Sequence, residues 1–526
     1  MLRKPRTRRM AAAVAAISSL AAGAAVAAPA GTSRGPSTST NPYVLPVANG
    51  VAIKSLLSVG DSGSASNGYE MVGIPDGLGA FGGAGGDRFT LFMNNELTTT
   101  AGRVRRHGQQ GAFVERLRID SESLEVEKGR DLINPGVRYW DYPSRTYGST
   151  PSRGGANPRE PMDTFVAQMA AFSRFCSGSL TPRGLLYDES TRRGYRKQIY
   201  FANEEAGAEG RVFGVTKNGK ARQLPRLGLA SWENTNVADT RNETTLTIGD
   251  EDGSEGQLWV HLGRKLRSGG AFDRAGLTNG GVYVVDLADE AVDSDAEFRA
   301  AFGKGKRARF TIGTDEEINW DRSGEHQNEE ALARGLSLNR IEDGAFDPRN
   351  PDDYYFTTTE GAPGSVPGQP GVTRDGGGLW RLRFDNVRKP KRGGTLELLL
   401  DGTEAPALNK PDNMTIDGHG NLLIQEDPGN NAQLARIVAY DIETGRRGVL
   451  AEFDPSLFRE GAPRFITQDE ESSGIIDAGR MLGRGWFLFD AQIHEANPDP
   501  ALVEYGQLLA MRVRNFRDVY DIAGSP

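Results

Sequence analysis

Short apolar runs of strand length, each bounded by a glycine or an acidic turn, recur along this chain. Examples are RFTLFMNNEL (88–97), GQLWVHLG (256–263), GVYVVDL (281–287), GNLLIQED (420–427) and ARIVAYDI (435–442). Their content of Val, Tyr, Phe, Trp and Thr is typical of β-strands. EEALARGLSLNRI (329–341) is the best candidate for an interior helix, over part of its length. The pattern therefore predicts an all-β protein with decorating loops and short helices.

Phrases of the form G-x-L/V-aromatic-x-V/L return several times, as the blades of a β-propeller do. The 67 glycines and 27 prolines fit this prediction, because many short strands need many turns. The spacing is too irregular to count blades from the residues, and a large double sandwich would give similar runs. No Pro/Ser-rich linker interrupts residues 45–515, so we expect a single catalytic domain over 45–526.

The N-terminus has the layout of a signal peptide over residues 1–27. A basic segment ends in Arg8-Arg9, an alanine-rich segment follows, and Ala25-Val26-Ala27 supplies a cleavage site. The paired arginines favour the twin-arginine export route, with an ordinary secretory signal as the alternative. Residues 28–44, rich in Gly, Ser, Thr and Pro, are expected to form a flexible lead-in. The mature chain is then periplasmic or extracellular and has no transmembrane segment.

The charge balance argues against a nucleic-acid partner, because acidic residues outnumber basic ones by 70 to 62 and the formal net charge is −8. We expect a monomer that acts on small molecules. Three familiar kinds of site also fit the sequence less well. The five histidines form no HExxH, no Gly-x-Ser-x-Gly elbow appears where a serine hydrolase needs one, and the glycine run 82–86 lacks the Lys-Ser/Thr of a phosphate loop.

Several predicted strands end in carboxylates that a sheet does not need. The phrases are NNE (94–96), NEE (203–205), WEN (232–234), RIEDG (340–344), PDN (411–413) and QEDP (425–428). Hard cations bind clusters of carboxylate and amide oxygens, and the strands of a propeller converge on a central channel. Taken singly, each carboxylate is better explained as a solvated turn residue. Six such phrases, each set in an aromatic or apolar strand, favour a metal site.

Cys176 is the only cysteine of the 526 residues, so an internal disulfide is excluded. A thiolate is a soft metal ligand, and a cation that occupies it would protect it in an oxidising compartment. A buried thiol acting as a small hydrophobic side chain is the alternative.

Taken together, the chain resembles the PhoX family of secreted alkaline phosphatases. The matching phrases are PDGLGAF, FTLFMNNE, RFCSGSL, NEEAGAEGRVFGV, SWENTNVAD, GDEDGSEGQLWVHLGRK, RIEDGAFDP, DYYFTTT, GGLWRLRFDN, PDNMTIDGHGNLLIQEDPGNN and DEESSGIIDA. They occur in order from about residue 70 to about residue 480, which is most of the mature chain. The resemblance implies a six-bladed propeller, calcium and iron in its channel, hydrolysis of phosphate esters, and twin-arginine export.

The resemblance also implies roles for particular residues. Cys176 matches an iron ligand, Arg340 a phosphate-contacting arginine, and Glu342 and Asp412 calcium ligands. Glu96 and Glu233 match acidic ligands shared among the metals. Further metal-ligand candidates lie in matching phrases without a fixed role: Glu204, Glu205 and Glu426.

The chain departs from the family pattern at Asn95 and Trp232, where the family often has His, and at Phe346, where it favours Trp. These differences indicate a divergent branch. Two other functions stay open on the sequence alone. One is a propeller hydrolase that uses calcium only, such as a lactonase or a phytase-like enzyme, and the other is a secreted propeller that binds a partner without catalysis.

Overall fold

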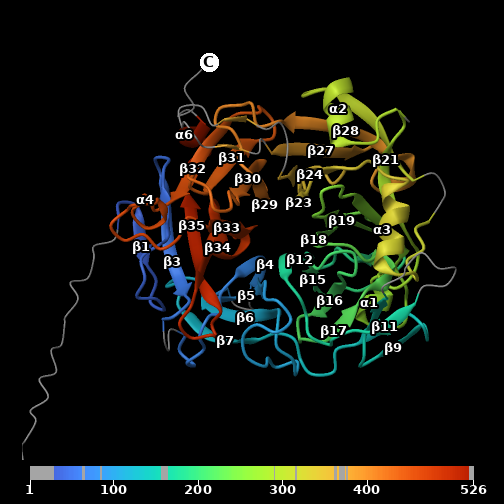
Figure 1. Ribbon diagram of the computed structural model, residues 1–526, viewed down its shortest axis with the longest axis horizontal. Coiled ribbons are helices and arrows are strands. Elements are labelled where there is room, and N and C mark those ends of the chain that lie inside the picture. The colour runs from blue at the N-terminus through green and yellow to red at the C-terminus, as the bar shows by residue number, and fades with distance from the viewer. Residues whose placement is uncertain are drawn as a thin grey trace, which may run out of the picture.

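The computed structural model describes residues 29–61, 65–82, 86–155, 164–289, 291–313, 317–359, 364–365, 373–374 and 377–520. The expected signal peptide, residues 1–27, lies outside the described residues. Antiparallel four-stranded units stand around a central axis, as blades do in a propeller (Figure 1). The predicted all-β propeller is confirmed. Among the described residues, no helix has the length and apolar character needed to cross a membrane.

The first three units follow one another along the chain, and each is given from its innermost strand outward. The first holds β4 (Pro75–Gly82), β5 (Arg88–Asn95), β6 (Phe113–Asp120) and β7 (Val126–Asp131). The second holds β12 (Phe175–Leu180), β15 (Ile199–Glu204), β16 (Val212–Thr216) and β17 (Ala221–Gln223). The third holds β18 (Trp232–Val237), β19 (Thr244–Glu251), β20 (Leu258–Arg264) and β21 (Gly281–Leu287).

The remaining three units close the ring. The fourth holds β23 (Ile341–Phe346), β24 (Asp353–Thr358), β27 (Gly378–Phe384) and β28 (Gly394–Leu400), and β22 (Arg307–Ile312) joins it to the third. The fifth holds β29 (Pro411–Ile416), β30 (Asn421–Glu426), β31 (Arg436–Asp441) and β32 (Arg447–Phe453), with β2 (Val44–Pro46) at its edge. The sixth holds β33 (Glu470–Asp477), β34 (Trp486–Ala496), β35 (Glu504–Val513) and β3 (Val51–Ser58), with β1 (Thr32–Arg34) outermost.

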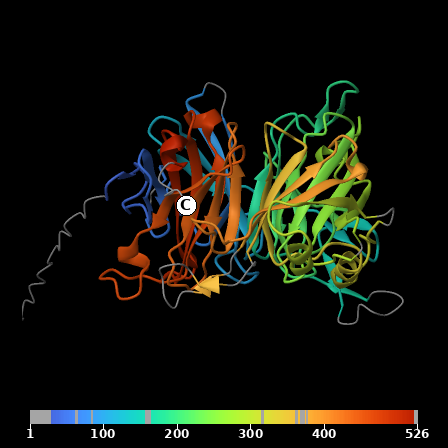
Figure 2. The same cartoon turned by 90° about the horizontal axis from the view of Figure 1, so that it is seen from above.

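N-terminal strands complete the last two units, so strands from both ends of the chain lie side by side (Figure 2). β3 pairs antiparallel with β35, and β2 pairs antiparallel with β32. The prediction of a flexible lead-in over residues 28–44 is wrong, because this segment contains β1 and the first residue of β2. β1 pairs in parallel with β3, and the Asp61 carboxylate accepts hydrogen bonds from the hydroxyls of Thr38 and Ser39. The Ser and Thr residues of this segment thus form side-chain hydrogen bonds that hold it in place.

Short elements decorate the ring. The helices are α1 (Ala271–Arg274), α2 (Asp295–Ala301), α3 (Gly324–Leu332), α4 (Pro455–Phe458), α5 (Gly479–Leu482), α6 (Phe516–Tyr520) and the 3-10 turns Pro225–Leu227 and Pro390–Arg392. The small hairpins are β8 (Tyr139–Asp141) with β9 (Thr146–Gly148), β10 (Ser152–Gly154) with β11 (Phe165–Ala167), β13 (Tyr187–Asp188) with β14 (Arg193–Gly194), and β25 (Gly364–Ser365) with β26 (Thr373–Arg374). α3 covers only the start of the predicted helical run, because Leu336 and Leu338 beyond it are buried in the apolar core.

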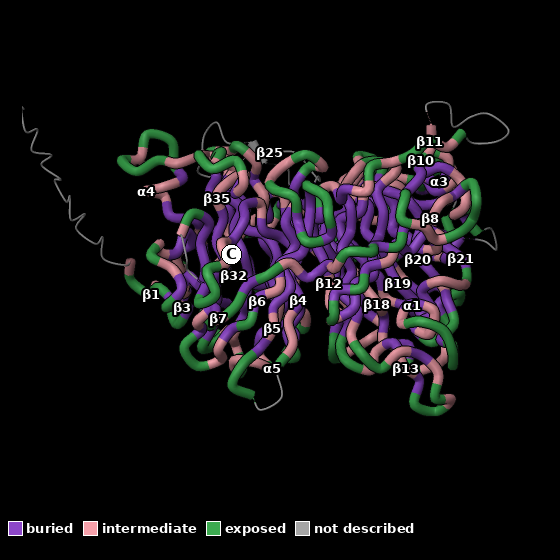
Figure 3. The backbone as a smooth tube through the Cα atoms, turned by 90° about the horizontal axis from the view of Figure 1, so that it is seen from below, coloured by how far each residue is buried: buried purple, intermediate pink, exposed green. Residues whose placement is uncertain are grey.

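The faces of neighbouring units bury their apolar side chains against each other, while the connecting loops are exposed (Figure 3). Phe92 of β5, for example, meets Tyr200 of β15 edge to face, with ring centroids 5.6 Å apart. The innermost strands β4, β12, β18, β23, β29 and β33 contact one another in a closed ring. At Gly77 of β4 the approach is so close that a Cβ atom would lie 2.2 Å from the Gly178 nitrogen, so a larger residue cannot fit. This ring of strands forms the wall of the central channel.

Candidate functional site

The second residue of every innermost strand carries a side chain of a type that can bind a metal ion. The six residues are Asp76, Cys176, Glu233, Glu342, Asp412 and Glu471. All six are buried. Because the innermost strands contact one another around the axis, equivalent positions on them place six ligand side chains on one circle.

Each innermost strand also has an irregularity in its pairing, either across this position or within the four residues that follow it. The register shifts between Asp76 and Leu78 in β4, for instance, and between Trp232 and Asn234 in β18. The same happens in the other four strands. A β-bulge bends a strand and redirects a side chain, and bulges are common beside active sites. The same bulge in all six strands therefore interrupts the regular pairing of the sheet close to each candidate ligand.

A second layer of ligands comes from the residue that follows the second strand of a unit. These residues are Glu96 after β5, Glu205 after β15, Asp252 after β19 and Asp427 after β30. Together with five residues of the circle they line a cavity of about 350 Å³, whose wall also includes Asp469. The sixth circle residue, Asp76, is not among the lining residues of this cavity. Nine carboxyl groups and Cys176 face this cavity, against Arg174, Arg340 and His494 as the cationic side chains among its described lining residues.

Strand geometry explains why neighbouring acidic residues behave differently here. Glu204 and Glu426 are the last residues of β15 and β30, and successive side chains in a strand point to opposite sides. Glu204 is therefore turned away from the cavity, where Arg211 binds both its oxygens at 2.6 and 2.7 Å. Arg436 binds both oxygens of Glu426 in the same way, at 2.8 and 2.6 Å. Neither Glu204 nor Glu426, both predicted as metal ligands, is among the residues that line the cavity.

The other expected residues come together in one place. Glu96, Cys176, Glu205, Glu233, Glu342, Asp412 and Arg340 all line the cavity. Further residues of the site were not predicted from the sequence. They are Asp76, which accepts from the Cys176 thiol, and the cavity-lining residues Arg174, Asp252, Asp427, Asp469, Glu471 and His494. Asp76 and Glu471 occupy the same strand position as the four circle members that were predicted, so aligning the innermost strands on that position would have found them.

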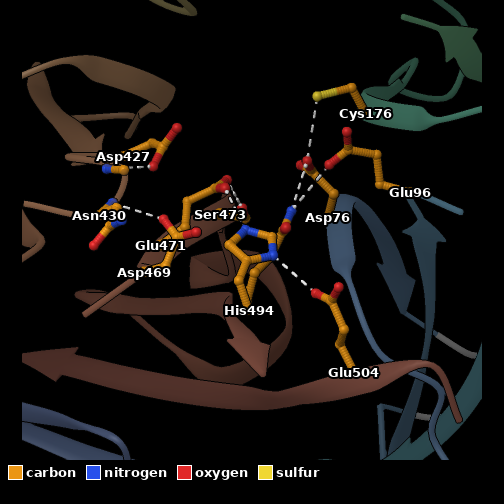
Figure 4. Close-up of polar contacts among 12 residues, drawn as sticks. Asp76, Glu96, Cys176, Asp427, Asn430, Asp469, Glu471, Ser473, His494 and Glu504 are labelled. Carbon is orange, nitrogen blue, oxygen red and sulfur yellow. Dashed lines mark hydrogen bonds and ion pairs between the residues drawn. The ribbon is translucent and has the colours of Figure 1, made fainter. Parts of the chain in front are cut away.

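Two groups of ligand atoms are compact enough to hold a cation. Asp76, Glu96 and Cys176 form one, and Glu233, Glu342 and Asp412 form the other, with the ligand atoms of each group within 4.8 Å of one another. The Cys176 thiol donates to Asp76 Oδ2 at 3.4 Å, and Figure 4 shows Asp76 and Glu96 directed toward the same point. In the second group, the buried oxygens Glu233 Oε1 and Asp412 Oδ1 have no hydrogen-bond partner among the described residues. Buried carboxylate oxygens without donors fit cation ligands.

The protein alone does not stabilise this much negative charge. Burial raises the pKa of the Cys176 thiol well above its usual value, and the nearby Glu233 carboxylate raises it further. Burial likewise raises the pKa of Glu205 to about 8 and that of Asp427 to about 7. A bound cation reverses this effect, because it favours the ionised form of each ligand. The residues present therefore fit bound metal ions.

The two arginines of the cavity are held by its acidic wall. Arg340 donates through Nε and Nη2 to the two oxygens of Asp252, at 2.9 and 3.0 Å. Arg174 Nη2 lies 2.7 Å from Glu96 and also binds Glu205. Each arginine directly precedes an innermost strand and has a positive φ, 51° for Arg340 and 41° for Arg174. Positive φ is costly for residues other than glycine and tends to occur at functional sites, which agrees with their place in the wall.

His494 of β34 closes the wall beside Glu471. Its Nδ1 lies 2.8 Å from Glu504, and its Nε2 lies 3.6 Å from Glu471 (Figure 4). Burial alone would lower the pKa of His494, but its contacts with Glu471 and Glu504 raise it to about 11. His494 is therefore an imidazolium at neutral and mildly alkaline pH.

The three departures from the family pattern lie in packing positions. The Asn95 amide donates to the Val72 carbonyl at 3.0 Å, and the Trp232 indole donates to the Gly210 carbonyl at 3.2 Å. Phe346 packs on Tyr354, with ring centroids 4.8 Å apart. None of the three lines the cavity that holds the ligand circle.

Fold and site together define a propeller with a metal-binding channel. Residues 180–464, more than half of the chain, match the family described as Alkaline phosphatase PhoX, and the chain belongs to this family. It is accordingly a metal-dependent phosphoric ester hydrolase. No curated protein matches the chain.

Among solved structures, the chain is similar to Pseudomonas fluorescens PhoX in complex with vanadate, a transition-state analogue. The identity is 14%, the TM-score is 0.57, and the match covers 89% of this chain and 97% of that one. This similarity supports the fold. A luciferin-regenerating enzyme (10% identity, 84% and 92% covered, TM-score 0.30) and a Xanthomonas campestris gluconolactonase (9%, 84% and 96%, 0.27) also match, with TM-scores too low to carry an argument.

Proposed function

We propose that the protein is an exported phosphatase that hydrolyses small phosphate esters at a calcium and iron centre in the propeller channel. The observation that carries this proposal is the repeated position: each innermost strand supplies one ligand side chain from its second residue. Twin-arginine export of the folded, metal-loaded chain, to the periplasm or beyond, is part of the proposal.

The donor set supports two kinds of cation. Carboxylate oxygens are hard ligands and suit calcium, and they dominate the group of Glu233, Glu342 and Asp412. A thiolate is a soft ligand and suits iron, and Cys176 lies in the other group with Asp76 and Glu96. When bound, the cations neutralise charge on the phosphate and act as Lewis acids.

The side chains of this chain orient both ligands and substrate. The Thr359 hydroxyl donates to Glu342, and the Gln492 amide donates to Asp76 at 3.2 Å, which fixes the direction of these carboxylates. Asp252 holds the Nε and Nη2 edge of Arg340, so the Nη1 end is left to donate to a phosphate oxygen. His494, kept protonated by Glu471 and Glu504, holds a further positive charge at the wall of the cavity.

Hydrolysis of p-nitrophenyl phosphate by protein exported in folded form tests this proposal. Turnover with calcium should disappear with a calcium chelator and return when calcium is restored, and elemental analysis should find iron. Turnover with calcium but without iron would instead support the calcium-only hydrolase, which has no use for Cys176. Absence of turnover in protein that contains both metals would contradict the phosphatase assignment.

A further inference from the structure

A face of the first blade, outside the cavity of the candidate metal site, carries a row of like charges. β6 presents Arg116 and Arg118 on this face, and β7 presents Lys128 and Arg130. In the antiparallel register Arg116 lies opposite Arg130, and Arg118 lies opposite Lys128. Like charges placed directly across two strands destabilise a sheet. We call these four residues the basic face.

The basic face is concave and continues onto the next blade. Its four side chains and Thr90 of β5 line a cavity of about 240 Å³. Lys217, in the turn between β16 and β17, borders it, because Arg116 Nη1 donates to the Lys217 carbonyl at 3.0 Å. Burial lowers the pKa of Lys217, and the neighbouring Arg116 lowers it further. A fifth positive charge therefore extends the row across the gap between two blades.

Few carboxylates offset these charges. Glu127 binds Arg118 at 2.7 Å, but it also binds Arg88 at 2.6 Å. Over the described parts of the chain, no carboxylate forms an ion pair with Arg116, Lys128 or Arg130. Such a concentration of cations in a protein with a formal net charge of −8 points to an anionic ligand.

We propose that the basic face binds a linear, base-free polymer of phosphate groups. Residues two apart on one face of a strand are separated by about 6.7 Å, so each of the four side chains can contact a different phosphate of an extended chain. Arginine is well suited to phosphate, since its guanidinium can donate two parallel hydrogen bonds. The choice of phosphate rests on the activity of the family, and the binding surface itself does not depend on the metal centre.

Two other occupants fit less well. Single-stranded nucleic acid is bound by aromatic side chains on which bases stack. The aromatic ring at this border, Phe81, is covered by the Lys217 ammonium, 3.4 Å from the ring centroid. A membrane surface requires apolar side chains that insert beside the charges. Among the described residues, the exposed large apolar side chains are Val47, Val104, Val166, Met169, Leu266, Leu332 and Phe465, none of them on the basic face.

The test compares two double variants that lose the same charge. Lys128→Gln with Arg130→Gln alters the basic face, and Lys306→Gln with Arg484→Gln alters exposed positions outside it. Binding of linear inorganic polyphosphate is measured in excess calcium, so that uptake at the metal centre is the same in both. The first variant should bind about tenfold more weakly than the second, and the slope of log affinity against log salt should fall by about two. Its melting temperature should be unchanged or higher, because cross-strand repulsion is removed.

Equal polyphosphate affinity in the two variants would overturn the proposal. Tighter binding of single-stranded DNA than of polyphosphate would overturn the choice of polymer, and so would binding to anionic vesicles without binding to polyphosphate. Turnover of p-nitrophenyl phosphate should be the same in both variants, so a failure of this proposal is distinct from a failure of the phosphatase assignment.

Discussion

Replacing Arg340 by lysine tests whether the forked shape of this side chain, and not its charge alone, serves catalysis. The Nε and Nη2 groups of Arg340 are fully used by the two oxygens of Asp252, and Nη2 also lies 3.2 Å from Glu342. Lysine has one ammonium group, which cannot hold Asp252 and reach the substrate at the same time. Arg340→Lys thus keeps the net charge and removes the donor proposed for the phosphate.

The size of the effect follows from the hydrogen bond to phosphate that the substitution removes. Removing one donor that stabilises charge in the transition state commonly costs about 100- to 1000-fold in kcat, or about 2.7–4 kcal/mol. We expect a decrease of this size in kcat for p-nitrophenyl phosphate with calcium present. The metal content should be unchanged, because Arg340 is not a ligand.

Arg349 offers a matched control. It is paired with Asp347 as Arg340 is with Asp252, and both arginine side chains are 35% exposed. Arg349 does not line the cavity. Arg349→Lys should leave kcat within about twofold. A turnover of Arg340→Lys as high as that of Arg349→Lys would refute the role given to the fork.

Three further variants test other parts of the account. Cys176→Ser should lose its iron, as measured by elemental analysis, and unchanged iron would contradict the thiolate ligand. Glu204→Gln should lower the free energy of unfolding by about 3–5 kcal/mol in denaturant titrations, because it leaves Arg211 charged and buried, whereas Glu205→Gln one residue later should mainly reduce metal content and turnover. Glu115→Gln should stabilise the protein at alkaline pH, because burial raises the pKa of Glu115 to about 8. Between pH 4.5 and 8 the folded protein keeps a proton on Glu115 that the unfolded chain releases, so the stability of the wild type falls as pH rises. The stability gained by Glu115→Gln should therefore be at most about 5 kcal/mol above pH 8 and should vanish near pH 5. A gain in stability that does not depend on pH would refute this explanation.

The strands could be predicted from sequence because their apolar runs and turns are local signals. GNLLIQED, for example, contains all of β30. The closure of the ring could not be predicted in this way, since β2 and β3 pair with strands near the other end of the chain. Pairing over such distances leaves no local pattern in the sequence.

The site was predictable where a phrase contains one acidic residue and ambiguous where it contains two. Glu233 and Asp412, predicted as metal ligands, both line the cavity, and each is the acidic residue that follows directly on the first residue of its strand. NEE and QEDP each contain two adjacent acidic residues, of which one points into the blade and the other lines the cavity. Which residue does which depends on where the strand ends, and the sequence alone does not give that position. Asp76 was missed because the phrase PDGLGAF reads as a turn, although its Asp occupies the same position as Asp412 in PDN.

Diffraction from crystals of the folded, exported protein on both sides of the iron absorption edge tests the central claim most directly. The account predicts an iron peak bonded to the Cys176 sulfur and calcium density within reach of Glu233, Glu342 and Asp412. A cavity that contains only water in active protein would contradict the claim that the second residues of the innermost strands form a metal centre.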